Sequence, residues 1–130
     1  PEYFNAERRG LYAYLTGSAS WLIYLLLTRI YGVRGDCGDL VVDPQLVRDD
    51  FDARGECAVR LPFAGRPLHI VFRNVSRLAP GRYGVESVTC GGRAMKVVGR
   101  CGAGVRIARS AVESLPASRE TRLVVTLGRV

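Results

Sequence analysis

The segment that most constrains the fold runs from Tyr14 to Tyr31 and predicts a helix that is apolar on every side. After Thr16-Gly17-Ser18, apolar residues fill nearly every position from Ala19 to Tyr31. A helix without a polar face is typical of the interior of a larger helical assembly. The apolar run is too short to cross a bilayer, which takes about 20 residues, so we expect no membrane contact. We therefore expect a buried helix that belongs to a helical layer larger than this chain.

The start of this helix has two interpretations. Thr16 or Ser18 can act as the N-cap by accepting a hydrogen bond from a backbone N–H of the first turn. Gly17 lets another backbone or a ligand come close. The first turn contains no Asp or Glu, so no acidic side chain balances the positive end of the helix dipole. The segment is either an ordinary capped core helix or a site for an external anion such as phosphate, and spacing alone leaves both open.

The sequence after Gly32 predicts a mainly β fold. Gly32 is well placed just past the end of the helix. Residues 57–63 and 68–73 alternate between apolar and polar side chains, which predicts a β-hairpin that turns at 64–66. Together with the runs 40–42, 83–88, 94–98 and 121–127 they give six or seven short strands, while 111–115 predicts one helical turn. The expected architecture is a C-terminal antiparallel β-sandwich preceded by one buried helix.

Two glycine-rich segments predict turns rather than sites. Residues 35–39 predict a turn, and residues 99–104 predict a hairpin connection. The second segment lacks the strand–GxGxxG–helix context of a phosphate-binding loop.

The net charge is +7 from 19 Lys and Arg residues, of which only Lys96 is a lysine. The arginines are scattered, and only Arg8 and Arg9 are adjacent. A nucleic-acid interface usually shows a dense basic run with interleaved aromatic residues. We therefore expect no nucleic-acid partner; a real one would bind with steep salt dependence.

The cysteines and the one histidine predict no metal site. Cys37, Cys57, Cys90 and Cys101 form no C-x-x-C pair, and His69 is not at ligand spacing from any of them. No signal peptide is visible, so we expect free thiols and a cytoplasmic protein. His69 faces away from Leu68 and Ile70, and no Ser, Cys or acid lies at a distance that indicates a catalytic base.

Six motifs follow one another along the chain, at residues 1–5, 14–21, 32–35, 38–40, 43–44 and 63–66. In kind and order they resemble motifs in the C-terminal part of the cellobiose and chitobiose phosphorylase family, and cyclic β-1,2-glucan synthases carry a similar terminal region. The resemblance is dense over about the first 75 residues, and the block Thr16–Trp21 is its most specific part.

This resemblance implies a domain organisation. Family members have an N-terminal β-sandwich, a helical linker, an (α/α)6 barrel and a small C-terminal β-sandwich. Residues 1–32 would then be the end of the barrel, and residues 33–130 the C-terminal sandwich. The chain begins at Pro1 without a Met, and we expect it to be a fragment whose partner is the remainder of the phosphorylase.

The resemblance also implies the chemistry. The family phosphorolyses a β-linked disaccharide with inversion: an acid protonates the leaving oxygen while phosphate, the co-substrate, attacks the anomeric carbon. A Thr-Gly pair contributes to the family's phosphate pocket, and Thr16 and Gly17 match it, with Ser18 beside them. This match favours the anion interpretation of the helix start.

The family's catalytic Asp, and the Arg and His of its phosphate site, lie upstream of this segment. We therefore assign no catalytic residue here, and we give no catalytic role to Asp36, Asp39 or Asp43. The chain alone is expected to be inactive and to need no cofactor beyond phosphate.

An alternative is a non-catalytic β-sandwich, either structural or carbohydrate-binding. Carbohydrate modules usually offer exposed aromatic side chains, and only Phe51, Phe63, Phe72 and Tyr83 follow residue 32. Separately, the helix 18–31 should either pack back on the sandwich or drive self-association, because an exposed apolar patch of that size usually finds a neighbour.

Overall fold

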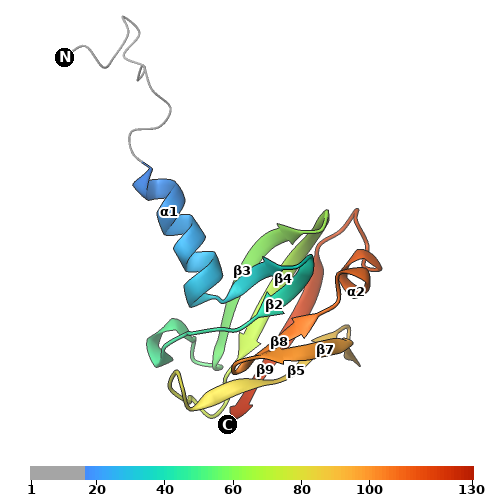
Figure 1. The fold of residues 1–130 in the computed structure, drawn as a ribbon. Coiled ribbons are helices and arrows are strands. Elements are labelled where there is room, and N and C mark those ends of the chain that lie inside the picture. The colour runs from blue at the N-terminus through green and yellow to red at the C-terminus, as the bar shows by residue number, and fades with distance from the viewer. Residues whose placement is uncertain (1–16) are drawn as a thin grey trace, which may run out of the picture.

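The computed structural model describes residues 17–130, which form a projecting helix followed by a two-sheet β-sandwich (Figure 1). Thr16 lies outside the described residues. The helical elements are α1 (Ser18–Leu25), a π-helical turn (Leu26–Ile30), a 3-10 turn (Arg48–Asp50) and α2 (Arg109–Glu113). The strands are β1 (Val33–Asp36), β2 (Asp39–Val42), β3 (Glu56–Phe63), β4 (Arg66–Arg73), β5 (Tyr83–Cys90), β6 (Arg93–Ala94), β7 (Val97–Cys101), β8 (Gly104–Ile107) and β9 (Thr121–Arg129).

The strands form a four-stranded sheet, β1-β2-β8-β7, and a five-stranded sheet, β3-β4-β9-β5-β6. The mainly β prediction is confirmed, but the sheets are not purely antiparallel, because β4 and β9 pair in parallel. The reason lies in the connectivity. The chain reaches β9 from the other sheet through α2, so no hairpin fixes the direction of β9 relative to β4.

The predicted turn at 35–39 is shorter in the structure. Asp36 pairs with Asp39, so only Cys37 and Gly38 turn, and the residues before them form β1, which the sequence analysis missed. Cys37 and Gly38 both have positive φ (51° and 89°), as a tight two-residue hairpin turn requires. A hairpin connection is present between β7 and β8 as expected, but it is shorter than 99–104: Cys101 pairs with Gly104, so only Gly102 and Ala103 turn.

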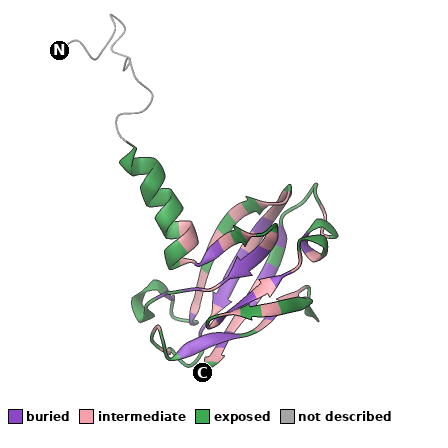
Figure 2. Ribbon diagram, viewed as in Figure 1, coloured by how far each residue is buried: buried purple, intermediate pink, exposed green. Residues whose placement is uncertain are grey.

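The core lies between the two sheets, where alternate residues of each strand point inward (Figure 2). The predicted hairpin β3–β4 is present, and Leu68, Ile70 and Phe72 are fully buried on its inner face. The five-stranded sheet supplies Leu123 and Val125 from β9 to the same core. The sandwich therefore closes its own core without help from α1.

The predicted burial of the first helix is not found in this chain. No residue of α1 is buried, and the exposed fraction of Trp21 is 65%. Figures 1 and 2 show α1 pointing away from the sandwich, and Figure 2 colours it as exposed. The prediction rested on a surrounding helical layer, and the described residues contain none. Gly17 occupies the N-cap position in place of Thr16 or Ser18, and α1 has no side-chain cap hydrogen bond.

The base of the helix is held firmly by the sandwich. The Gln45 N–H donates to the Ile30 carbonyl (2.9 Å), and the Asp43 N–H donates to the Gly32 carbonyl (2.9 Å). The Tyr31 ring packs against Phe72 with ring centroids 6.2 Å apart. The predicted helix end at Gly32 is confirmed: its φ is +65°, and a Cβ there would overlap the Asp43 carbonyl. The exposed helix is thus anchored at its base.

Gly32→Ala should destabilise the protein more than Gly65→Ala. Both glycines have positive φ, which costs an alanine about 1–2 kcal/mol, but the space around Gly65 is open. The clash with Asp43 adds to the cost only at Gly32. Urea denaturation of both variants measures the difference; equal losses of unfolding free energy would show that the junction does not require close backbone approach.

Tyr83 ties the segment after β2 to β5. It is 2% exposed, and its hydroxyl donates to the carbonyls of Leu46 (2.9 Å) and Pro44 (3.3 Å). Burial raises the pKa of Tyr83 to about 12.

This shift predicts a pH dependence of stability. Because the pKa of Tyr83 is raised on folding from 10.0 to about 12, its contribution is fully present below pH 10. The contribution is lost as the pH rises through about 12. The free energy of unfolding should therefore fall across this interval more steeply in the native protein than in Tyr83→Phe. Parallel slopes for the two proteins would mean that Tyr83 ionises as readily in the folded state as in the unfolded state.

Candidate functional site

The candidate site predicted from sequence lies at the N-terminal end of α1, far from the sandwich. Gly17 and Ser18 are exposed there, and the first turn has no acidic residue. The Gly17 carbonyl accepts the first helical hydrogen bond, from the Trp21 N–H at 3.1 Å. At 1.5 Å per residue, the helix puts this end about 18 Å from its base at Ile30. The sandwich therefore contributes no side chain to Gly17 and Ser18.

Two aromatic rings lie beside this helix end. Trp21 and Tyr24 form an edge-to-face pair, with centroids 5.9 Å apart and planes at 86°. Together with Ser20 they line an open apolar hollow of about 410 Å³. Exposed apolar side chains occupy successive positions from Trp21 to Leu26, so they surround the helix axis. Contact with a single flat surface would leave part of this apolar surface in water.

The π-helical turn adds a feature that the sequence analysis missed. The Tyr31 N–H donates to the Leu26 carbonyl at 2.9 Å, five residues back. Thr28 Oγ1 donates to the Tyr24 carbonyl at 2.7 Å. Such wide turns are often found near functional sites. No pattern in the apolar run predicts a π-helical turn at these residues rather than ordinary α-helix.

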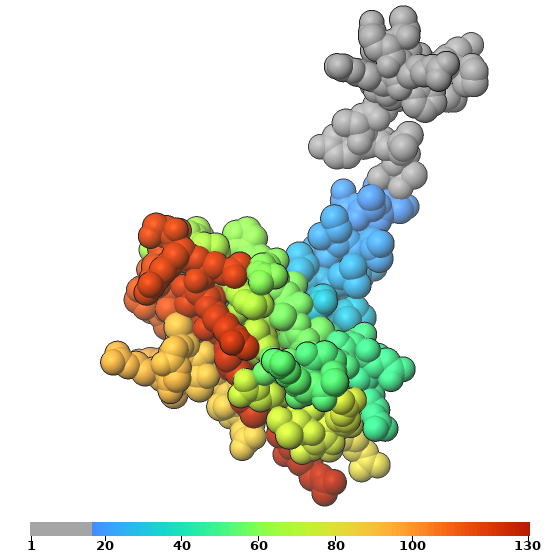
Figure 3. All heavy atoms as spheres, turned by 180° about the vertical axis from the view of Figure 1, so that it is seen from behind, coloured from blue at the N-terminus to red at the C-terminus, as the bar shows by residue number. Residues whose placement is uncertain are grey.

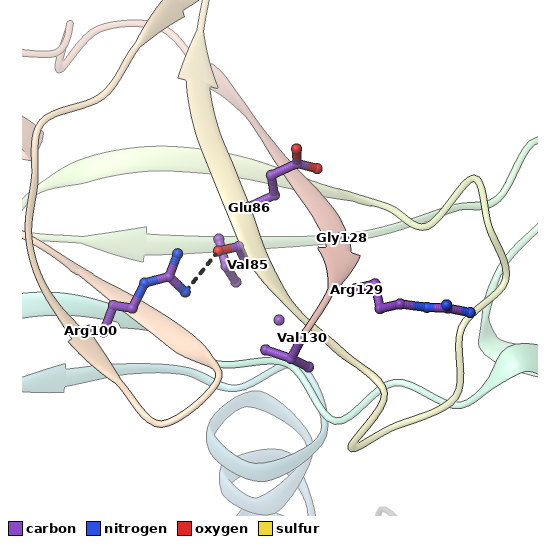
Figure 4. A pocket seen from close by; sticks show the side chains of 7 residues that line it. Val85, Glu86, Arg100, Gly128, Arg129 and Val130 are labelled. Carbon is purple, nitrogen blue, oxygen red and sulfur yellow. Dashed lines mark hydrogen bonds between the residues drawn. The ribbon is translucent and has the colours of Figure 1, made fainter.

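A second hollow, of about 360 Å³, lies at one end of the sandwich (Figure 4). Arg100 donates to the Val85 carbonyl at 3.4 Å, whereas Arg129 points away from Arg100. Glu86 sits at a β-bulge, and its carboxylate lies over Gly128. The charged side chains diverge, and the lining contains no Ser, Cys or His. Among the side chains that line this hollow, only the Glu86 carboxylate could act as a base.

The aromatic residues of the sandwich do not form a sugar-binding platform. Phe51, Phe72 and Tyr83 are buried, and Phe63 packs against the core. Among the aromatic side chains of residues 33–130 only Phe63 is partly exposed, so the sandwich lacks the group of exposed rings on which carbohydrate-binding modules stack sugars. The exposed rings within the described residues are on α1.

Three aspartates of the sandwich pair with arginines. Asp36 and Asp39 pair with Arg106, and Asp43 lies 3.7 Å from Arg34. All four cysteines are free thiols. Burial raises the pKa of the Cys57 thiol. Residues 17–130 hold no cluster of three or more potential metal ligands.

No helix among the described residues is long and apolar enough to span a membrane. Comparison of the sequence with models of known protein families and with curated proteins gives no match.

The exposed helix predicts association of the isolated chain. Light scattering coupled to size exclusion should give a mass above the 14.2 kDa of one chain. Leu22→Glu with Tyr24→Glu places charges on opposite sides of α1 and should restore the monomer. Val75→Glu is the control, because Val75 is 72% exposed but lies outside the helix. A native chain that runs as a monomer would contradict the prediction.

Proposed function

We propose that this chain is the C-terminal region of an inverting glycoside phosphorylase, an enzyme that converts a β-linked disaccharide and phosphate into a sugar 1-phosphate and a sugar. In this proposal residues 1–32 complete a helical catalytic barrel, and residues 33–130 form a sandwich that braces it. The protein works in the cytoplasm, where its four thiols stay reduced.

One observation carries the proposal: α1 is apolar and exposed around its axis, yet its base is fixed to a sandwich that needs nothing from it. Exposed apolar surface of this extent is unfavourable in water by roughly 25 cal/mol per Å². A helix held at its base projects this surface in a defined direction. A layer of neighbouring helices would cover every side of α1, as a pairwise contact would not.

The phosphate-binding role rests on the helix start and on the resemblance of Thr16-Gly17 to the family's motif. Thr16 would donate its hydroxyl and Gly17 its backbone N–H, with Ser18 beside them. The absence of an acidic residue in the first turn favours an anion there. The acid that protonates the leaving oxygen would come from the barrel, so this chain supplies binding rather than proton transfer.

The test uses the longest natural protein that contains these residues. It should convert β-linked disaccharides to sugar 1-phosphate with inverted configuration, and only when phosphate is present. Thr16→Ala should raise the KM for phosphate about tenfold, since one hydrogen bond to a charged group is lost. Thr28→Ala on the same helix is the matched control and should leave this KM unchanged.

Two outcomes would contradict the proposal. One is hydrolysis or no reaction of β-linked disaccharides by the larger protein. The other is phosphorolysis by the isolated 130-residue chain, which would place the catalytic acid within it.

A further inference from the structure

The outer face of the five-stranded sheet carries a row of three basic residues that the proposed function does not use. Arg60 on β3 pairs directly with His69 on β4, and His69 pairs directly with Arg122 on β9. Directly paired residues point to the same side of a sheet, and here the inward positions belong to the apolar neighbours. Like charges placed opposite one another across strands destabilise a sheet.

The acidic groups nearby neutralise this row only in part. The Glu120 carboxylate lies 3.1 Å from Arg60 Nε and 3.7 Å from His69 Nδ1. Glu56 binds Arg73 at 2.7 Å and reaches Arg122 only at 3.7 Å. Glu120 therefore pairs with Arg60 and His69, at one end of the row. The Arg122 side chain at the other end is 55% exposed, and it shares the Glu56 carboxylate with Arg73.

Three hollows adjoin on this row. One of about 250 Å³ is lined by Arg60 and Glu120, and one of about 290 Å³ by Arg119, Glu120 and Arg122. A third, of about 280 Å³, has His69 and Arg122 in its lining together with the carboxylates of Asp52 and Glu56. The His69 side chain is 20% exposed, and each neighbouring strand places an arginine directly beside it. Figure 3 views the molecule from behind, with β9 in red and β3 and β4 in greens.

We propose that this row, Arg60–His69–Arg122, binds a phosphate group, either as the free ion or as a phosphate monoester. Adjacent strands are about 4.8 Å apart, so the Cα atoms of Arg60 and Arg122, two strands apart, are separated by about 10 Å. Both long side chains can then close on one oxyanion above the imidazole. A phosphate has enough oxygens to accept a guanidinium fork from each side and a hydrogen bond from His69 Nδ1 or its partner nitrogen.

His69 gives a direct test, because it is the only histidine in the chain. Its imidazole resonances can be followed in the full 130-residue protein at constant pH and ionic strength while inorganic phosphate is added. We expect a saturable change with half-saturation below about 10 mM, the affinity range of an exposed ionic site. Phenyl phosphate in a second titration distinguishes an ester ligand, which would saturate at lower concentration, from the free ion.

Arg122→Gln should raise the half-saturating concentration about tenfold, as expected for the loss of one charge-assisted interaction. Arg129→Gln is the matched control, because it removes the same charge from the far end of the same strand and should change nothing. Phosphate bound at Gly17 instead would leave the His69 resonances unmoved. No saturable change, the same change with sodium chloride, or equal effects of the two substitutions would each overturn the proposal.

Discussion

The structure depends on the close approach of two backbone segments at the junction between the helix and the sandwich. Gly32 and Asp43 come together so closely that no side chain fits at Gly32, and two backbone hydrogen bonds join the segments there. The same segment after β2 continues to Leu46, whose carbonyl accepts from the buried Tyr83 hydroxyl. The junction thus links α1 to both sheets. This linkage holds the apolar helix in one orientation relative to the sandwich.

The arginine content has a structural explanation in this fold. Val41 and Val71 are buried although they face outward, one on each sheet. Arg34 and Arg106 stand directly beside Val41 on the neighbouring strands, and both pair with carboxylates. Long arginine stems cover apolar surface while their charged ends stay in water. Ion pairs on the outer faces therefore account for part of the basic composition.

Local patterns in the sequence predicted much of the sandwich. The alternation in residues 57–63 and 68–73 specified a hairpin and its inner face, and Gly32 marked the helix end. The parallel pairing of β4 with β9 depends on contacts between distant segments, so no local pattern contains it. The predicted phosphate residues were only partly located: Gly17 and Ser18 lie at an exposed helix end, and Thr16 is outside the described residues. The row at His69 was not predicted, because residue 122 reaches residues 60 and 69 only through the pairing of β4 with the distant strand β9.

The central claim is that α1 belongs inside a larger helical layer. Hydrogen exchange of the backbone amides in residues 18–25 tests it most directly, measured in the isolated chain and in the longest natural protein that contains it. We expect the amides of α1 to exchange at least a hundredfold more slowly in the larger protein, since burial suppresses local opening. Equal and fast exchange in both would contradict the claim and leave α1 a solvent-exposed helix in both proteins.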